Sequence, residues 1–161
     1  MSKLSHSFDN NRKWSDGIKA DNPGFFETSA TEQSPRYLWI GCADSRVPAS
    51  QVVGLGPGEL FVHRNVANRV IDTDLNWPTF MRYAIDVLKV RDLVIGHYGC
   101  GGVQAAYEND ENGELDNWLC QLRDVQKRHC DEIEAMADKA ATLERLCELN
   151  VITQVGNVCR T

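Results

Sequence analysis

The amino-acid sequence predicts an α/β fold in which a mostly parallel β-sheet is flanked by helices. Three short and largely apolar runs are bounded by turn residues and are typical of buried strands: Tyr37–Ile40, Glu59–His63 and Asp92–Ile95. Strands that alternate with helical segments usually pair in parallel. At 161 residues the chain is long enough for one core. We therefore expect residues 1–161 to form a single domain.

Residues 1–30 are predicted to form an N-terminal helical arm. The apolar residues of this arm recur among polar ones at loosely helical spacing: Leu4, Phe8, Trp14 and Ile18. The turn residues Asp21–Gly24 then end the helix. Because this stripe has little to pack on within so short a domain, we expect the arm to pack on a partner subunit.

Three further helices are indicated by apolar periodicity. The first is Pro78–Val90, and its predicted inward residues are Phe80, Met81, Ala84, Ile85, Val87 and Leu88. The others are marked by apolar residues between 115 and 125 and between 143 and 158. The last pattern is still apolar-periodic at Val158, with no Gly or Pro stop before the chain ends at Thr161. We expect this chain to be a shortened version of something longer.

Composition and charge exclude several functional classes. Seventeen Lys and Arg against 23 Asp and Glu give a net charge of −6, and the absence of a basic stripe argues against nucleic acid as a partner. No apolar run approaches the roughly 18–20 residues of a membrane span, and the N-terminus lacks a hydrophobic signal core. We therefore predict a cytoplasmic protein, in which the six cysteines stay free or bind metal.

Thiol and imidazole side chains follow two of the predicted strands. Cys42 comes after the first strand, and His97 and Cys100 come after the third. The carboxyl ends of parallel strands lie at one edge of a sheet, so two distant loops can meet there. A Cys₂His set suits Zn²⁺ and leaves a fourth position for water, substrate or a carboxylate. An isolated His-x-x-Cys is more often a core cysteine beside a hydrogen-bonded histidine, and that alternative stays open on this pair alone.

The loop Cys42–Arg46 adds a carboxylate and a guanidinium beside the predicted metal ligand. Asp44, two residues after Cys42, can reach a metal or hydrogen-bond its water, and Arg46 can hold the carboxylate in a bidentate pair. The alternative is a strand-end turn with a surface salt bridge, but that alternative leaves the cysteine unexplained.

These motifs together resemble one enzyme family. The chain has C-x-D-S-R at Cys42–Arg46 and G-H-x-x-C-G-G at Gly96–Gly102, and the segments Pro57–Asn68 and Leu146–Val151 are also similar to that family. Over essentially its whole length the chain resembles the β-class carbonic anhydrases of bacterial type. The resemblance implies Zn²⁺ held by Cys42, His97 and Cys100. It also implies reversible hydration of carbon dioxide to bicarbonate and a proton through a zinc-bound hydroxide, with Asp44 and Arg46 as the catalytic dyad.

The resemblance implies further roles for single residues. Asp44 can act as a fourth zinc ligand in a closed form, from which Arg46 draws it away. Gln33, Phe61 and Val66 match positions of the substrate pocket, with Gln33 supplied by the neighbouring subunit of a homodimer or homotetramer. Trp39 and Arg64 match two members of an inhibitory bicarbonate site found in one subgroup, whose third member, a Tyr near the chain end, has no counterpart here.

One departure from the family leaves two other functions open. Members normally continue past the position of Thr161 into another helix and a further strand, so we expect that C-terminal strand to be absent. The chain could then be a non-catalytic zinc-binding paralogue or a regulatory subunit. It could also be a related zinc hydrolase of another small substrate such as carbon disulfide. The presence of both Asp44 and Arg46 favours catalysis over inert zinc binding.

Overall fold

The computed structural model describes residues 4–109 and 113–161, with the backbone alone for Asp92–Ile95. The chain divides into two compact units, Met1–Ser34 and Pro35–Thr161.

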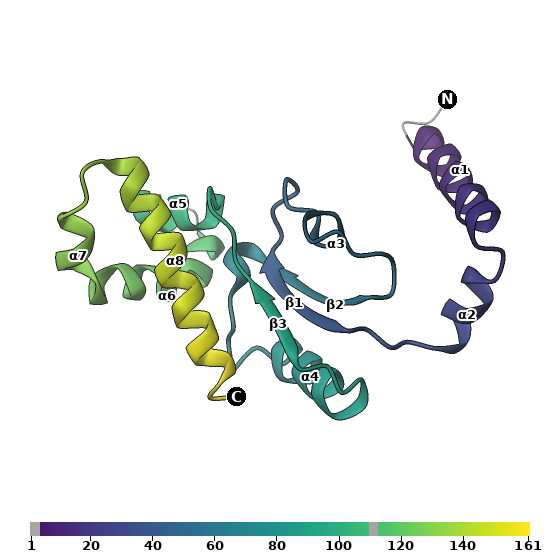
Figure 1. The fold of residues 1–161 in the computed structure, drawn as a ribbon. Helices are drawn as coiled ribbons and strands as arrows, with labels where there is room; N and C mark the ends of the chain where they lie inside the picture. The colour runs from purple at the N-terminus through teal and green to yellow at the C-terminus, as the bar shows by residue number, and fades with distance from the viewer. Residues whose placement is uncertain (1–3, 110–112) are drawn as a thin grey trace. The chain divides into compact units, whose positions relative to one another are not determined.

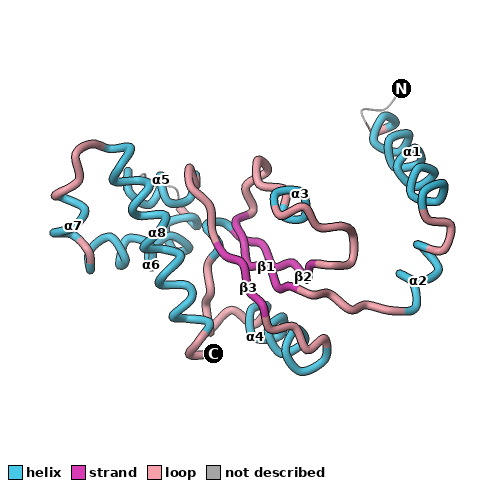
Figure 2. Tube along the Cα trace, viewed as in Figure 1, coloured by secondary structure: helices cyan, strands magenta, loops and turns pink. Residues whose placement is uncertain are grey.

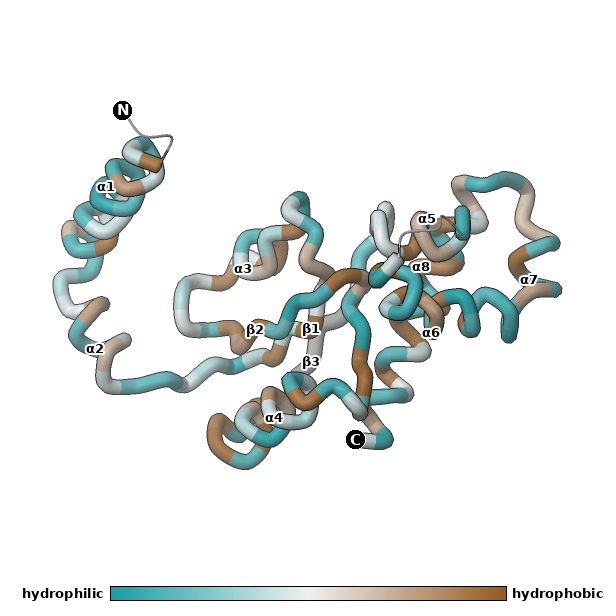
Figure 3. The backbone as a smooth tube through the Cα atoms, turned by 180° about the vertical axis from the view of Figure 1, so that it is seen from behind, coloured by the Kyte–Doolittle hydropathy of each residue, from teal (hydrophilic) through white to brown (hydrophobic). Residues whose placement is uncertain are grey.

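The first unit consists of two helices, α1 (Ser5–Asp21) and α2 (Phe25–Thr31). The predicted helix and its stop at Asp21–Gly24 are confirmed, because Asn22 caps α1 with its backbone N–H on the Ile18 carbonyl. The Trp14 ring meets Phe26 of α2 edge-on at 5.9 Å. Most of α1 is hydrophilic, interrupted by single hydrophobic residues (Figure 3), and Leu4 and Phe8 are 63% and 62% exposed. The packing of this arm on a partner subunit stays a prediction.

The second unit is built on three parallel strands in the order β2-β1-β3. They are β1 (Tyr37–Cys42), β2 (Leu60–Asn65) and β3 (Asp92–Ile95), and their arrows point the same way in Figure 1. Cys42 lies opposite Asn65 on β2, and Ile40 lies opposite Ile95 on β3. The predicted parallel sheet is therefore confirmed, and the segments that follow β1 and β3 leave from the same edge.

Helices surround this small sheet (Figure 2). Their bounds are α3 Ala49–Val52, α4 Asn76–Arg82 with a π-helical turn at Tyr83–Val87, α5 Gly101–Glu108, α6 Glu114–Arg128, α7 Cys130–Glu134 and α8 Lys139–Val158. The sequence patterns did not predict α3, α5 or α7. Within residues 4–109 and 113–161, none of the helices combines the length and the apolar character that a membrane crossing needs.

Two hydrophobic clusters hold the second unit together. In one cluster Leu38 and Ile40 of β1 pack with Trp77 and Ala84 from the α4 segment. The other cluster is formed mainly by α5, α6 and α8 and also includes the buried side chains of Cys42 and Cys100. Both cysteines are thus held in a packed environment at the edge of the sheet, where side-chain positions are well defined.

Candidate metal centre

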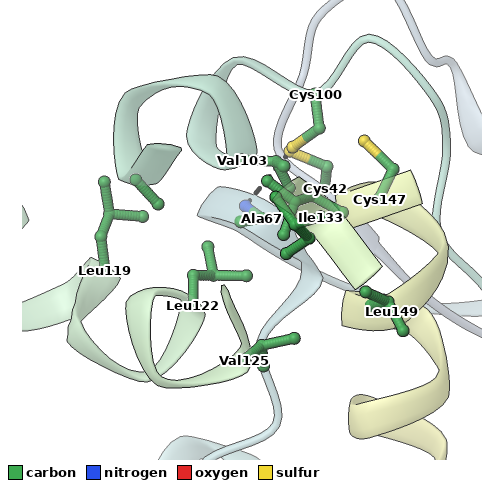
Figure 4. Packing of buried hydrophobic residues seen from close by; sticks show 12 residues of the cluster. Cys42, Ala67, Cys100, Val103, Leu119, Leu122, Val125, Ile133, Cys147 and Leu149 are labelled. Carbon is green, nitrogen blue, oxygen red and sulfur yellow. Dashed lines mark hydrogen bonds between the residues drawn. The ribbon is translucent and has the colours of Figure 1, made fainter. Parts of the chain in front are cut away.

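The three predicted ligands meet at the carboxyl edge of the sheet. Cys42 is the last residue of β1, and His97 and Cys100 lie in the short loop between β3 and α5. One ligand atom from each residue can be chosen so that all three lie within 4.8 Å of one another, and the two sulfur atoms are 3.8 Å apart. Figure 4 shows the two thiols pointing toward each other from different segments.

The imidazole of His97 is oriented for coordination. Its Nδ1–H donates to the Tyr98 carbonyl at 2.7 Å, which places the ring proton on Nδ1. Nε2 is then an acceptor, and it is buried without a hydrogen-bond partner in the described part of the chain. A buried nitrogen without a hydrogen-bond partner is unfavourable in free energy. A metal-binding histidine has this arrangement, because one nitrogen donates to a carbonyl and the other is left to bind the metal.

The donor set fits Zn²⁺. Two thiolates at about 2.3 Å from a tetrahedral zinc ion lie roughly 3.8 Å apart, which matches the observed separation of the sulfur atoms. Soft sulfur and imidazole donors favour Zn²⁺ over Mg²⁺ or Ca²⁺, which prefer oxygen. The residues present therefore suit a Cys₂His site with one position open.

The two thiols differ in acidity. A hydrogen bond with the Cys100 thiol is the largest cause that lowers the pKa of Cys42, to about 4. The backbone amides of Ala67 and Asp44 also lower it, and burial opposes this effect. Sharing its proton with Cys42, together with burial, raises the pKa of Cys100. One thiol of the pair therefore ionises more easily than the other, and metal binding would release the remaining proton.

Asp44 and Arg46 form a close ion pair beside the thiols. Arg46 Nε donates to Asp44 Oδ1 at 3.0 Å and Nη2 donates to Oδ2 at 2.6 Å. Nη2 also donates to the Gly99 carbonyl at 2.8 Å, which ties the two ligand loops together. The hydrogen bond from Arg46 holds the pKa of Asp44 well below its usual range, so the carboxylate stays ionised. The predicted bidentate pair is present, and it is part of a connection between loops rather than an isolated surface salt bridge.

Arg64 braces the backbone of the same loop. Its Nε donates to the Cys42 carbonyl at 2.8 Å and its Nη2 donates to the Asp44 carbonyl at 2.6 Å. Trp39, the other residue matched to the inhibitory bicarbonate site, is buried, and its Nε1 has no partner among the described residues. Arg64 thus has a structural contact with the site that the sequence did not predict.

The three residues matched to the substrate pocket lie in different settings. Phe61 on β2 stacks on Phe80 at 4.7 Å, and Val66, which is 40% exposed, accepts a hydrogen bond from Trp118 Nε1 at its carbonyl. Gln33 belongs to the first unit, in an exposed stretch that follows α2. The pocket assignments therefore stay predictions.

Residues 37–161 match a family model described as carbonic anhydrase. A solved structure of a tetrameric β-carbonic anhydrase from Sordaria macrospora superposes on the chain with a TM-score of 0.94 and 37% identity, covering 98% of this chain and 81% of that one. The chain belongs to the β-carbonic anhydrase family. The carbonic anhydrase of Emericella nidulans is 47% identical over 155 residues, which cover 96% of this chain and 68% of that protein. The Candida albicans carbonic anhydrase is 38% identical over 96% of this chain and 56% of its own length.

This chain therefore spans 68% of the length of the Emericella nidulans carbonic anhydrase and 56% of the length of the Candida albicans carbonic anhydrase.

Proposed function

We propose that this β-carbonic anhydrase chain catalyses the reversible hydration of carbon dioxide with Zn²⁺ held by Cys42, His97 and Cys100. The observation that carries the proposal is the convergence of these three donors next to the Asp44–Arg46 pair. A purely structural zinc site usually has four protein ligands, whereas three leave a position for the reacting water.

The metal would lower the pKa of a bound water to about 7 and so supply a nucleophile near neutral pH. Asp44, ionised and held by Arg46, can only accept hydrogen bonds, and it would orient the attacking water toward carbon dioxide. Arg46 would restrain the same carboxylate from occupying the open metal position. The contacts of Arg46 with both Asp44 and Gly99 support this role.

The rest of the proposal concerns the assembly. Residues 1–161 would act as one zinc domain in a cytoplasmic homodimer or homotetramer, with the N-terminal arm packed on a neighbouring subunit. Phe61 and Val66 would line the substrate pocket together with Gln33 of the partner subunit. The exposed apolar residues of α1 and the tetrameric state of the Sordaria macrospora enzymes support association.

Stopped-flow hydration of carbon dioxide, run beside zinc analysis of the purified chain, tests the proposal. The expected result is one zinc per chain with hydration activity, both of which are lost in Cys42→Ser. The matched control is Cys120→Ser, which changes an exposed thiol of α6. Zinc binding without hydration would favour the non-catalytic relative, and hydrolysis of carbon disulfide without hydration would favour the related hydrolase. Undiminished zinc in Cys42→Ser would overturn the ligand assignment.

A further inference from the structure

The turn that follows β2 has a left-handed backbone at two consecutive residues. Ala67 has φ 64° and Asn68 has φ 46°, and neither is a glycine. This conformation is unfavourable for residues with a Cβ and persists only where surrounding contacts impose it. In this conformation the Ala67 N–H donates to the Cys42 sulfur at 3.3 Å, the contact drawn as a dashed line in Figure 4.

A row of carboxamides on α8 supplies such contacts. Asn150 Nδ2 donates to the Ala67 carbonyl at 3.1 Å, and Gln154 Nε2 donates to Asn150 Oδ1 at 2.8 Å. Gln154 Oε1 accepts from the Val70 N–H at 2.8 Å, and Asn157 Nδ2 donates to the Val70 carbonyl at 3.2 Å. The row therefore holds polar backbone groups at both ends of the turn.

The orientation of Asn150 is determined by its neighbours. Its oxygen accepts from Gln154, so its NH₂ group faces the Ala67 carbonyl. Asn150 and Gln154 are each only 1% exposed, on the face of α8 that packs into the core. Burying two carboxamides costs free energy unless their hydrogen bonds are made. The hydrogen bonds of Asn150 and Gln154 are therefore needed at these positions, where apolar side chains would be buried without that cost.

We propose that Asn150 is a positioning residue for the metal centre. By donating a hydrogen bond to the Ala67 carbonyl, Asn150 maintains the left-handed turn. This turn in its place directs the Ala67 N–H toward the Cys42 sulfur. The inference rests on the proposed function, because it takes this sulfur to be a zinc ligand. A hydrogen bond to a metal-bound thiolate lowers the energy of the sulfur lone pairs, and contacts of this kind tune both metal affinity and reactivity.

Replacing Zn²⁺ by Co²⁺ in the full chain lets the electronic state of the Cys42 sulfur be followed by absorption spectroscopy. In wild type, Co²⁺ should produce a thiolate-to-metal charge-transfer band. Asn150→Leu, with the same branching of four side-chain heavy atoms, removes the donor, and the loss of the N–H···S contact should move this band to lower energy. Release of Zn²⁺ to a chelator should become faster by on the order of 10-fold. Asn150→Ser, which is too short to reach Ala67 and adds no bulk to the buried face, should change both quantities in the same direction.

Asn157→Leu is the matched control, because it removes the hydrogen bonds of the same row to the Val70 carbonyl and to Gln154 Oε1 and leaves the Asn150 bond to the Ala67 carbonyl in place. It should lower the melting temperature and leave the band and the zinc release rate at wild-type values. The proposal is overturned if both Asn150 variants keep the wild-type band and release rate, or if Asn157→Leu shifts the band equally. If the wild-type chain shows no charge-transfer band with Co²⁺, the proposed metal site itself is wrong, and the inference about Asn150 fails with it.

Discussion

At the scale of single residues, the Arg46 side chain determines where the Asp44 carboxylate lies. Arg46→Ala removes two side-chain hydrogen bonds from Asp44 and the bond to the Gly99 carbonyl. We expect turnover in carbon dioxide hydration to fall by roughly 100-fold, the cost of a misplaced catalytic group, with zinc content unchanged. Arg36→Ala, which removes an exposed arginine 3.9 Å from Glu59, is the control. Full activity in Arg46→Ala would show that the dyad assignment is wrong.

The same variant has a predictable pH dependence. Arg46 holds the pKa of Asp44 below its usual range, so its removal should let that pKa rise toward the ordinary value of about 3.9. Asp44 then remains ionised above pH 6, and the loss of turnover should be equally large from pH 6 to pH 9. A loss confined to the acid side of a pH–rate profile would contradict this explanation.

His63 should make the fold sensitive to acid. It is buried on β2 between aromatic rings. Burial lowers its pKa, and the charge of Asp74 acts in the opposite direction. The unfolded state therefore takes up a proton at a higher pH than the folded state. The stability contributed by neutral His63 is complete above about pH 6.5 and is lost as the pH falls below it.

Urea unfolding measured from pH 7.5 to pH 5 tests this prediction. The free energy of unfolding of wild type should decrease over this range more steeply than that of His63→Gln, which carries no titratable group there. Equal slopes for the two proteins would mean that His63 does not contribute to the acid sensitivity.

Sequence could predict those residues whose side chains carry the chemistry. A thiol or imidazole after a parallel strand is informative because few residue types bind zinc, and Cys42, His97 and Cys100 do come together. Ala67 contacts the Cys42 sulfur through its backbone N–H and has a positive φ. An alanine in a sequence indicates neither the backbone contact nor the unusual φ. Asn150 lies in a helical pattern whose apolar residues predict the buried face, and a polar residue in such a pattern predicts exposure.

At the scale of elements, the loop after β3 requires glycine at its first position. Gly96 has φ +90°, and a Cβ there would collide with Val151 on α8. Gly96→Ala should destabilise the chain by about 2–5 kcal/mol through backbone strain and overpacking, and it should displace His97 and lower zinc content. Zinc analysis and thermal unfolding would measure both effects.

Two further variants separate the causes. Gly101→Ala, with open space around the new Cβ and no positive φ, should retain zinc and stability. Adding Val151→Ala to Gly96→Ala should recover the steric part of the loss but not the part due to backbone strain. No recovery in the double variant would mean that the collision with Val151 is not a significant cost.

Strand positions were predictable because each strand is a short apolar run. In two helices, by contrast, some residues of the apolar pattern are exposed. Ile85 and Val87 were predicted to face inward and are 45% and 59% exposed, so that prediction was wrong. The reason is the π-helical turn, in which the Leu88 N–H bonds to the Tyr83 carbonyl and shifts the period. On α8 the apolar Ile152 is exposed, because the buried face is used by the carboxamide row.

At the scale of the whole molecule, the apolar residues of α1 predict association. None of the described residues of α1 is buried, and Trp14 is 49% exposed. Burial of such a stripe against a second copy would stabilise an oligomer. Light scattering at micromolar concentration should therefore give a mass of two or four times 18.1 kDa. A monodisperse species of 18.1 kDa that still hydrates carbon dioxide would contradict dependence on a partner.

Mixing two inactive variants tests whether the active site is shared between subunits. If Gln33 works across the interface, Gln33→Ala and Cys42→Ser should each have little activity alone. In a mixed dimer, one site combines the intact Cys42 of the first variant with the intact Gln33 of the second. Co-expression in equal amounts should then restore about a quarter of wild-type turnover, because half of randomly assembled dimers are mixed and each has one intact site. If Gln33 instead served its own chain, every site in the mixture would lack one of the two residues and activity would not return.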